Sequence, residues 1–261
     1  MAGAIYGGLL DNGFNPDQIS IVDPSEGAQQ QAKSTGITRV YSTAPEAIEA
    51  DLIVLAVKPQ IASPVLASLQ GKLSASTTVL SIIAGIDSES LAKMLGLANT
   101  STIIRCMPNT PALVSEGMTA LLSNSQCSER GKMLAEQVMS AVGKTLWVSE
   151  EPDLDTVTAI SGSGPAYFFY LMEAMVEAAE SFNINREVAQ TLVLQTALGA
   201  ATMAQNHDSA PKALRAQVTS PGGTTEAACQ LLEAAGLSDT IQAACKAALD
   251  RSISLSNDQS A

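Results

Sequence analysis

Leu52-Ile53-Val54-Leu55-Ala56-Val57 is an unbroken apolar run in the first half of the chain. A strand that is apolar on both faces is typical of a parallel sheet covered by helices on both sides. Other short β-rich runs alternate with helical patterns around it, which predicts a doubly wound α/β sheet. The other expected strands span residues 19–23, 39–42, 78–83, 102–107, 119–122 and 145–148, and the expected helices span residues 2–12, 26–34, 61–69, 88–95 and 129–142.

The pattern changes at Glu150-Glu151-Pro152, a charged stretch with a proline, as is common at a domain junction. Only helical patterns follow, at residues 166–182, 186–205, 212–218, 226–235 and 239–254. We therefore predict two domains, residues 1–150 and residues 151–261. The helices of the second domain are apolar nearly all round, and such helices are buried either in a large core or by another subunit. Because the second domain is short, we favour an all-α dimerisation domain.

Composition argues against several classes of function. The chain has 261 residues, a net charge of −12 and no run of Lys or Arg, so we expect no binding of nucleic acid through its phosphates. Its single histidine is His207, and its four cysteines show no Cys-x-x-Cys spacing, so we predict no metal site. Cysteines isolated in apolar runs are typical of the core of a protein in a reduced compartment. No segment is apolar for long enough to span a membrane, and we expect a cytoplasmic protein without membrane contact.

A dinucleotide site is one candidate function of the N-terminal segment. In a dinucleotide-binding fold, a glycine-rich turn precedes a helix, and an acid about 20 residues after the glycines binds the ribose. Asp23 ends an expected strand at the place of that acid. The strand and the glycines that should precede the first helix are missing from the sequence, however. Asp23-Pro24 therefore indicates either a ribose-binding acid or a simple turn.

Two loops follow expected strands at the sheet edge where α/β proteins bind ligands. Ala56-Val57-Lys58-Pro59 places a lysine there that could meet a phosphate or a ribose, although a solvated loop lysine gives the same pattern. The second loop holds Asn109 between Pro108 and Pro111, which make the loop rigid. An asparagine amide can both donate and accept, which suits a nicotinamide amide or a substrate edge, but the residue is equally common in turns.

Two glycine-rich stretches in the second half each precede a helix. They are Ser161-Gly162-Ser163-Gly164-Pro165 and Ser220-Pro221-Gly222-Gly223-Thr224-Thr225. Pro165 fits the first helical position, and Thr224 or Thr225 fits a helix cap. Free backbone N–H groups and the helix dipole favour anions at such starts, and glycine lets a ligand touch the backbone. One such turn is usually only a cap, but two in one helical half favour a ligand site.

Taken together, these segments resemble the pyrroline-5-carboxylate reductase family over essentially the whole chain. The matching stretches are Ala56-Val57-Lys58-Pro59, Met107-Pro108-Asn109-Thr110-Pro111-Ala112-Leu113, Glu116-Gly117, Ser161-Gly162-Ser163-Gly164-Pro165-Ala166-Tyr167 and Ser220-Pro221-Gly222-Gly223-Thr224-Thr225. The resemblance implies a Rossmann-like N-terminal domain that binds NADPH or NADH and an all-α domain that forms a homodimer, with dimers sometimes assembling further. It also implies reduction of 1-pyrroline-5-carboxylate to L-proline, the last step of proline biosynthesis.

The resemblance assigns the site residues as follows. The substrate would be bound by Ser163, Ser220, Gly222, Gly223, Thr224 and Thr225, and the cofactor by Met1, Ala2, Asp23, Ala56, Val57, Lys58, Pro59 and Asn109. Thr225 would act in catalysis by hydrogen bonding to the ring nitrogen. Because a cyclic imine is basic enough to be protonated near neutral pH, a strong protein acid is not required, and we expect positioning to dominate catalysis.

The sequence departs from the family at its start. Family members begin with a strand and a Gly-x-Gly-Asn-Met turn, and Met1 and Ala2 look like the end of that turn. We therefore expect that the natural chain is longer and that its first strand is missing here. An acid such as Asp23 would favour NADH, whereas the family often prefers NADPH, so the choice of cofactor stays open.

Two other functions fit the sequence less well. A related reductase of hydroxy acids or other imino acids usually needs a catalytic Lys or His in its helical domain, and we can place neither. The alternative to an active enzyme is a catalytically impaired, dimeric helical protein that binds cofactor poorly because its N-terminal strand and glycine turn are missing.

Overall fold

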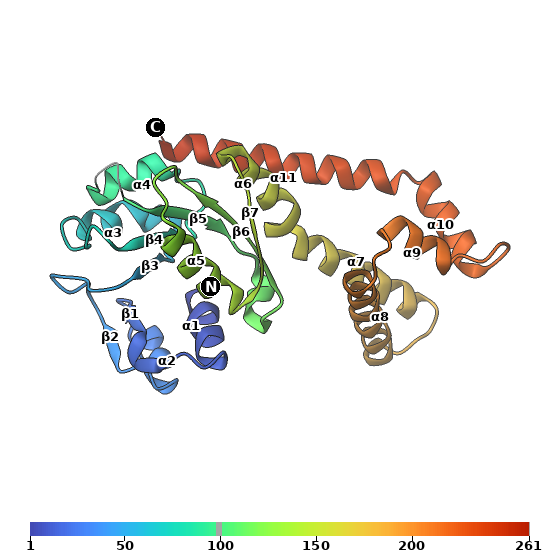
Figure 1. Ribbon diagram of the computed structural model, residues 1–261. Helices are drawn as coiled ribbons and strands as arrows, with labels where there is room; N and C mark the ends of the chain where they lie inside the picture. Colours follow the sequence, from blue (N-terminus) through green and yellow to red (C-terminus); the bar gives the residue numbers. More distant parts are fainter. Residues whose placement is uncertain (98–100, 261) are drawn as a thin grey trace. The chain divides into compact units, whose positions relative to one another are not determined.

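A mixed sheet of order β3-β4-β5-β6-β7 lies at the centre of the N-terminal part of the protein (Figure 1). Its strands are β3 (Leu52–Leu55), β4 (Thr78–Ser81), β5 (Ile103–Met107), β6 (Gly117–Ser123) and β7 (Gly143–Trp147). β3, β4 and β5 are parallel, β6 runs antiparallel to β5, and β7 is parallel to β6. Every residue of β4 is buried, as expected for an inner strand covered on both faces. The computed structural model describes residues 1–97 and 101–260, with side chains described up to residue 256.

A second, two-stranded parallel sheet pairs β1 (Ser20–Val22) with β2 (Arg39–Tyr41). The helix α2 (Glu26–Ser34) connects these strands and packs Ala32 against Tyr6 and Ile37. Within the described residues, β1 pairs only with β2, and β3 pairs only with β4. The Rossmann-like sheet is therefore present in two separate parts.

Short helices surround the two sheets. They are α1 (Ala2–Asp11), α3 (Ala62–Ser68), α4 (Ser88–Leu95), α5 (Glu129–Ser140) and α6 (Glu151–Val157), with 3-10 turns η1 (Pro16–Gln18), η2 (Pro59–Ile61) and η3 (Thr110–Val114). Three of the helices start where the sequence supplies a capping side chain. Ser25, Asp87 and Ser128 each accept a hydrogen bond from a backbone N–H in the first turn of α2, α4 and α5.

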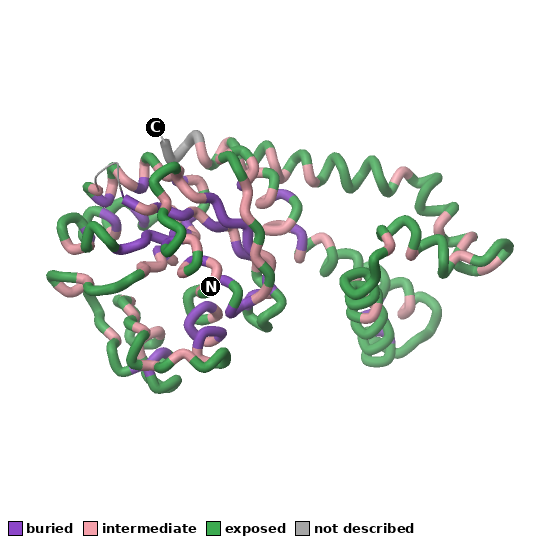
Figure 2. Tube along the Cα trace, in the orientation of Figure 1, coloured by how far each residue is buried: buried purple, intermediate pink, exposed green. Residues whose placement is uncertain are grey.

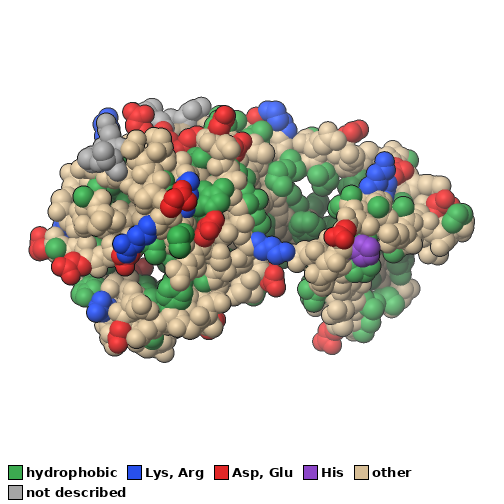
Figure 3. Space-filling view, viewed as in Figure 1, with side chains coloured by type: hydrophobic (Ala, Val, Ile, Leu, Met, Phe, Trp, Pro, Cys, Tyr) green, Lys and Arg blue, Asp and Glu red, His purple; other side chains and the backbone are tan. Residues whose placement is uncertain are grey.

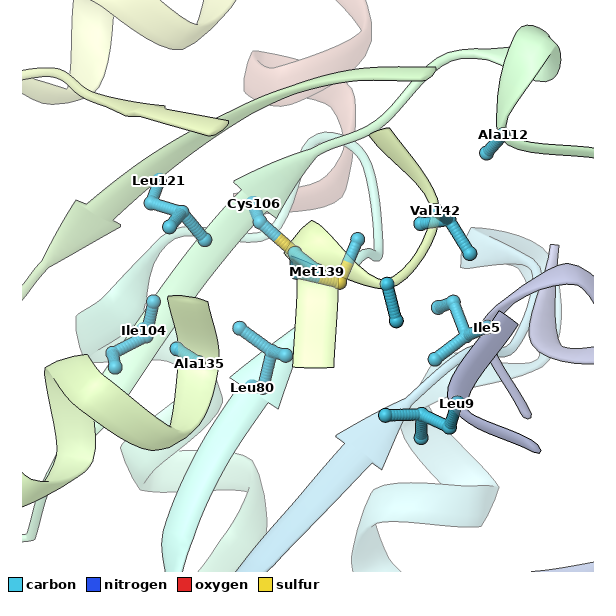
Figure 4. Packing of buried hydrophobic residues seen from close by; sticks show 11 residues of the cluster. Ile5, Leu9, Leu80, Ile104, Cys106, Ala112, Leu121, Ala135, Met139 and Val142 are labelled. Carbon is cyan, nitrogen blue, oxygen red and sulfur yellow. The ribbon is translucent and has the colours of Figure 1, made fainter. Parts of the chain in front are cut away.

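The main apolar cluster joins α1 and α5 to the inner strands (Figure 4). Leu80 of β4, Ile104 of β5 and Leu121 of β6 are fully buried, and Met139 of α5 covers them. Each such side chain contributes about 1.5–3 kcal/mol when it leaves water. Cys106 lies in the same cluster, and burial raises the pKa of its thiol, so it stays neutral as a core residue.

The chain divides into two compact units, residues 1–163 together with the chain from Ala248 onward, and residues 164–247. The second unit consists of α7 (Gly164–Ser181), α8 (Arg186–Asn206), α9 (Pro211–Gln217), α10 (Thr224–Ala234) and the first part of α11 (Leu237–Ser260). The end of α11 belongs to the first unit. The domains expected at residues 1–150 and 151–261 stay a prediction.

The second unit buries few of its apolar side chains (Figure 2). Its small core is Val176, Ala189 and Val193, between α7 and α8. Large apolar side chains remain exposed along both helices: Phe168, Phe169, Tyr170, Leu171, Leu192, Leu194 and Leu198. No helix among residues 1–97 and 101–260 has both the length and the apolar character needed to cross a membrane. These helices are apolar nearly all round, as the sequence indicated, yet this chain alone does not cover them.

Every strand and helix expected from the sequence is present, most with ends shifted by a residue or two. The main differences lie at two places. α11 continues to Ser260, and α6 was not expected. α6 leads through a π-helical turn, η4 (Thr158–Gly162), directly into α7.

Candidate functional site

The carboxyl ends of three strands meet at one edge of the larger sheet, because β3, β4 and β5 are parallel. After β3, the backbone of Lys58 starts η2, and its carbonyl accepts a hydrogen bond from Ile61 N–H. The Lys58 side chain is exposed and forms no ion pair with the acids in the described part of the chain. A cation at this edge is therefore available to an anionic ligand.

Asn109 follows β5 at the same edge and is held by three hydrogen bonds. Its amide nitrogen Nδ2 donates to the Ser161 carbonyl oxygen at 3.1 Å and lies 3.3 Å from Ser161 Oγ. Its oxygen Oδ1 accepts from Met118 N–H at 2.9 Å, at the start of β6. The sequence indicated either an amide for a nicotinamide or a substrate edge, or a turn residue, and Asn109 does precede the 3-10 turn η3 as its cap residue. In addition, its side chain joins the end of β5 to the π-helical turn.

The stretch Ser161-Gly162-Ser163-Gly164-Pro165 starts α7, as expected from its glycines and Pro165. The expectation of free N–H groups there is wrong for Ser163, whose N–H donates to the Thr158 carbonyl at 2.8 Å. The reason is that α6 and the π-helical turn precede α7 without a loop between them, so the chain supplies its own acceptor. π-helical turns of this kind are frequent at functional sites.

A network of charged side chains fixes α6 beneath this turn. Glu151 pairs with Arg105 of β5, and its carboxylate also accepts from Ser88 N–H at 3.2 Å and Ser88 Oγ at 3.1 Å. Ser252 of α11 donates to Asp155 at 2.6 Å. Arg105, Asp155 and Ser252 line a cavity of about 20 Å³, and the buried Nε of Arg105 has no hydrogen-bond partner among the described residues. That volume suits one water molecule and is too small for a substrate.

The start of the chain offers a helix end and an acid. Met1 and Ala2 are exposed at the N-terminus of α1, which no side chain caps. Asp23 is half-buried after β1, and its carboxylate accepts from Ser25 N–H at 2.8 Å. This contact holds the Asp23 carboxylate in one orientation.

The second glycine-rich stretch lies in the second unit, before α10. Gly222 has a φ of +71°, which favours glycine, and its N–H donates to Glu226 Oε2 at 2.7 Å. The expectation that Thr224 or Thr225 caps the helix is wrong. Gly223 is the cap residue, without a side-chain bond, and α10 begins at Thr224. Both threonines are therefore exposed in the first turn of the helix, where backbone N–H groups lack helical partners.

The predicted site residues thus fall into two groups. The first unit holds Met1, Ala2, Asp23, Ala56, Val57, Lys58, Pro59, Asn109 and Ser163, and the second holds Ser220, Gly222, Gly223, Thr224 and Thr225. Sequence reasoning missed Ser161 and Glu226 as structural partners of these residues. The spacing of Glu226, three residues after the cap Gly223, is the signal that could have revealed it, because a glutamate at that position reaches back to N–H groups.

Comparisons with known proteins match both halves of the chain. Residues 151–255 match the family profile for pyrroline-5-carboxylate reductase dimerisation, and residues 1–85 match the profile for the coenzyme F420-dependent NADP oxidoreductases. The pyrroline-5-carboxylate reductase of Pseudomonas aeruginosa is 45% identical over 98% of this chain and 93% of its own length. That of Haemophilus influenzae is 40% identical over 97% of this chain and 93% of its own.

Solved structures show the same relationship. A pyrroline-5-carboxylate reductase from Coxiella burnetii aligns with a TM-score of 0.91 and 40% identity, over 97% of this chain and 94% of that one. A Plasmodium falciparum pyrroline carboxylate reductase with NADP bound aligns with a TM-score of 0.83 and 30% identity, over 98% and 94%. Identities of this size over nearly the whole chain establish that the protein belongs to the pyrroline-5-carboxylate reductase family.

Proposed function

We propose that this protein reduces 1-pyrroline-5-carboxylate to L-proline with NADPH or NADH, as the last step of proline biosynthesis. The observation that carries the proposal is the substrate motif at Ser220–Thr225, which stands intact in a chain 45% identical to a reductase of that name. We further propose that it works in the cytoplasm, where its four free thiols stay reduced.

The residues of the first unit fit a dinucleotide. The uncapped N-terminus of α1 suits a pyrophosphate, and the exposed Lys58 adds a positive charge at the ligand edge. The Asp23 carboxylate suits a ribose hydroxyl. We propose that these residues hold the cofactor together with Met1, Ala2, Ala56, Val57, Pro59 and the loop that carries Asn109.

The residues before α10 suit a small carboxylate. The N–H of Gly223, expected to be free, donates to the Ser220 carbonyl at 3.0 Å. We therefore propose that the backbone N–H of Thr224 and the Ser220 hydroxyl bind the substrate carboxylate, that Gly222 and Gly223 shape this turn, and that Ser163 also takes part in substrate binding. The Glu226 carboxylate already accepts the Gly222 N–H, so it orients the turn and leaves the helix N–H groups to the substrate.

Thr225 is the residue proposed to act at the reacting bond. A bound nicotinamide cofactor supplies hydride to the imine carbon, and the nitrogen keeps the proton that it carried as the iminium. The Thr225 hydroxyl oxygen accepts a hydrogen bond from that N–H and so fixes the orientation of the ring. The motif contains no acid for proton transfer, because the substrate arrives protonated.

The exposed apolar faces of α7 and α8 support a homodimer, in agreement with the dimerisation profile over residues 151–255. Figure 3 shows hydrophobic side chains at the surface of these helices. A groove of about 630 Å³ along them is lined by residues that include Phe169, Met172 and Leu194. We propose that a second copy of the chain covers this face.

The decisive experiment is an assay of the purified protein with L-proline and NAD⁺ or NADP⁺ at high pH, followed by NAD(P)H absorbance. Proline-dependent formation of NAD(P)H is expected, and imine-dependent loss of NAD(P)H is expected in the forward direction. A dimeric, folded protein that shows neither reaction would contradict the proposal and support the impaired, purely dimeric alternative.

A further inference from the structure

Asn109 occupies a position between two chain segments that the sequence places far apart. On one side lies the start of β6, whose Met118 N–H donates to Asn109 Oδ1 at 2.9 Å. On the other side lies the π-helical turn, where the Ser161 carbonyl and hydroxyl receive Nδ2 at 3.1 and 3.3 Å. All of these residues belong to the first unit, so their contacts are internal to one compact body.

The amide of Asn109 is matched to both partners. Its oxygen meets an N–H, and its nitrogen meets a carbonyl, so only an uncharged amide satisfies both sides. The contacts of the side chain are with protein groups and its location is half-buried, which leaves little of the amide for a ligand.

The same turn also packs against the side chain of Met107, the last residue of β5. A Cβ added at Gly162 would lie 2.8 Å from Met107 Cε. The next residues, Ser163 and Gly164, are the last of the first unit and the first of the second. Whatever fixes the turn therefore fixes the backbone from which α7 starts.

We propose that Asn109 is a positioning residue for the reaction: it acts by holding Ser161–Ser163 against the ligand edge of the sheet, and not by contact with the cofactor. This inference rests on the proposed function, because it needs a reductase whose turnover can be measured. It replaces a direct nicotinamide contact with a protein-internal role for the Asn109 amide.

The test compares Asn109→Ala and Asn109→Asp with a matched control, Asn124→Ala. Asn124 forms the same kind of clamp at the opposite end of the β5–β6 pair, donating to the Ser101 carbonyl at 2.9 Å and accepting from Ile103 N–H at 3.3 Å. Asn109→Asp keeps the acceptor for Met118 but turns a carboxylate toward the Ser161 carbonyl. Steady-state kcat and KM, the dissociation constant of NAD(P)H from quenching of Trp147 fluorescence, and the melting temperature are measured for each.

For both Asn109 variants we expect kcat with the imine to fall about 10-fold to 100-fold, because a small misplacement is costly at a reaction centre. The dissociation constant of NAD(P)H should stay within about twofold of that of the unaltered protein. Asn124→Ala should lower the melting temperature to a similar extent and leave kcat unchanged.

Three results would overturn the inference. A raised dissociation constant for NAD(P)H in Asn109→Ala would show direct cofactor contact. Equal kcat values in the Asn109 and Asn124 variants would show a purely structural clamp. If Asn109→Ala does not fold, Asn109→Asp carries the test, because it keeps the acceptor for Met118 N–H and alters only the contacts with Ser161, and an unchanged kcat in that variant would also contradict the inference. Absence of activity in the unaltered protein would instead contradict the proposed function.

Discussion

Thr225 is exposed in the first turn of α10, where the proposed function places the ring nitrogen of the substrate. Thr225→Ala should lower kcat about 10-fold to 100-fold, the cost of losing a hydrogen bond to a charged group, without changing the affinity for NAD(P)H. Steady-state kinetics and cofactor titration measure the two effects separately. Thr225→Ser keeps the hydroxyl and is the control, and an unchanged kcat in Thr225→Ala would remove this hydroxyl from the mechanism.

Under the proposed function, Asp23 lies near the ribose and is expected to govern a different property, the choice between NADH and NADPH. Its carboxylate is oriented by Ser25 N–H, and a fixed negative charge near the ribose repels a 2′-phosphate. Asp23→Ser should raise the ratio of kcat/KM for NADPH to that for NADH by about tenfold. Asp11→Ser removes the same charge from the end of α1 and should leave the ratio as it was. The role of Asp23 would be refuted by equal ratios in the two variants.

At the scale of elements, the packing of α1 on the turn after α5 depends on one glycine. A Cβ at Gly8 would lie 2.5 Å from the Ala141 carbonyl oxygen and 2.6 Å from Val142 Cγ1, whereas a Cβ at Gly7 meets nothing within 4 Å. Gly8→Ala should therefore destabilise the protein by about 1–3 kcal/mol. Gly7→Ala should stabilise it by up to about 1 kcal/mol, because alanine favours a helix.

Chemical denaturation of the two variants measures this difference. The denaturation midpoint should fall for Gly8→Ala and rise or stay constant for Gly7→Ala. Equal midpoints would mean that α1 does not approach the Ala141 backbone in solution as closely as described.

The elements themselves follow from local patterns, and the interactions between them do not. The start of α4 was predictable because Asp87 caps it, and that of α5 because Ser128 does. The helix from Glu151 was missed because Glu150-Glu151-Pro152 was interpreted as a domain junction, and its π-helical continuation because glycines and serines at positions 161–164 favour a loop by local propensity. Tertiary contacts, including the bond from Asn109 to Ser161, override that propensity. No short sequence window contains both partners.

The sequence likewise indicated which residues belong to the candidate site, but not how their groups are oriented. Its residues stand in short contiguous motifs, so Lys58 and Ser220–Thr225 could be named from the sequence. The orientation of each group was not accessible. The motifs do not specify the backbone angles. These angles determine that the Ser163 N–H donates to Thr158 and that Glu226 accepts the Gly222 N–H.

At the scale of the whole molecule, the exposed apolar side chains of the second unit predict that the protein forms a dimer. Phe169 is 61% exposed in the apolar groove of α7 and α8. A large exposed apolar patch of this kind is typical of a surface that a partner covers. Phe169→Glu should convert a dimer into a monomer, because burying an unpaired carboxylate is strongly unfavourable. Analytical ultracentrifugation measures the change. Gln30→Glu adds the same charge on α2 and should leave the dimer intact, and a monomeric unaltered protein would contradict the proposed interface.

The last part of α11 returns to the first unit, where Ser252 donates to Asp155. During synthesis, which proceeds from the N-terminus, Asp155 of α6 leaves the ribosome long before Ser252, its hydrogen-bond donor. The whole of the second unit must be synthesised in between. The first unit therefore cannot complete its packing when residue 163 has been synthesised, and the contact between Asp155 and Ser252 forms only after the second unit has followed.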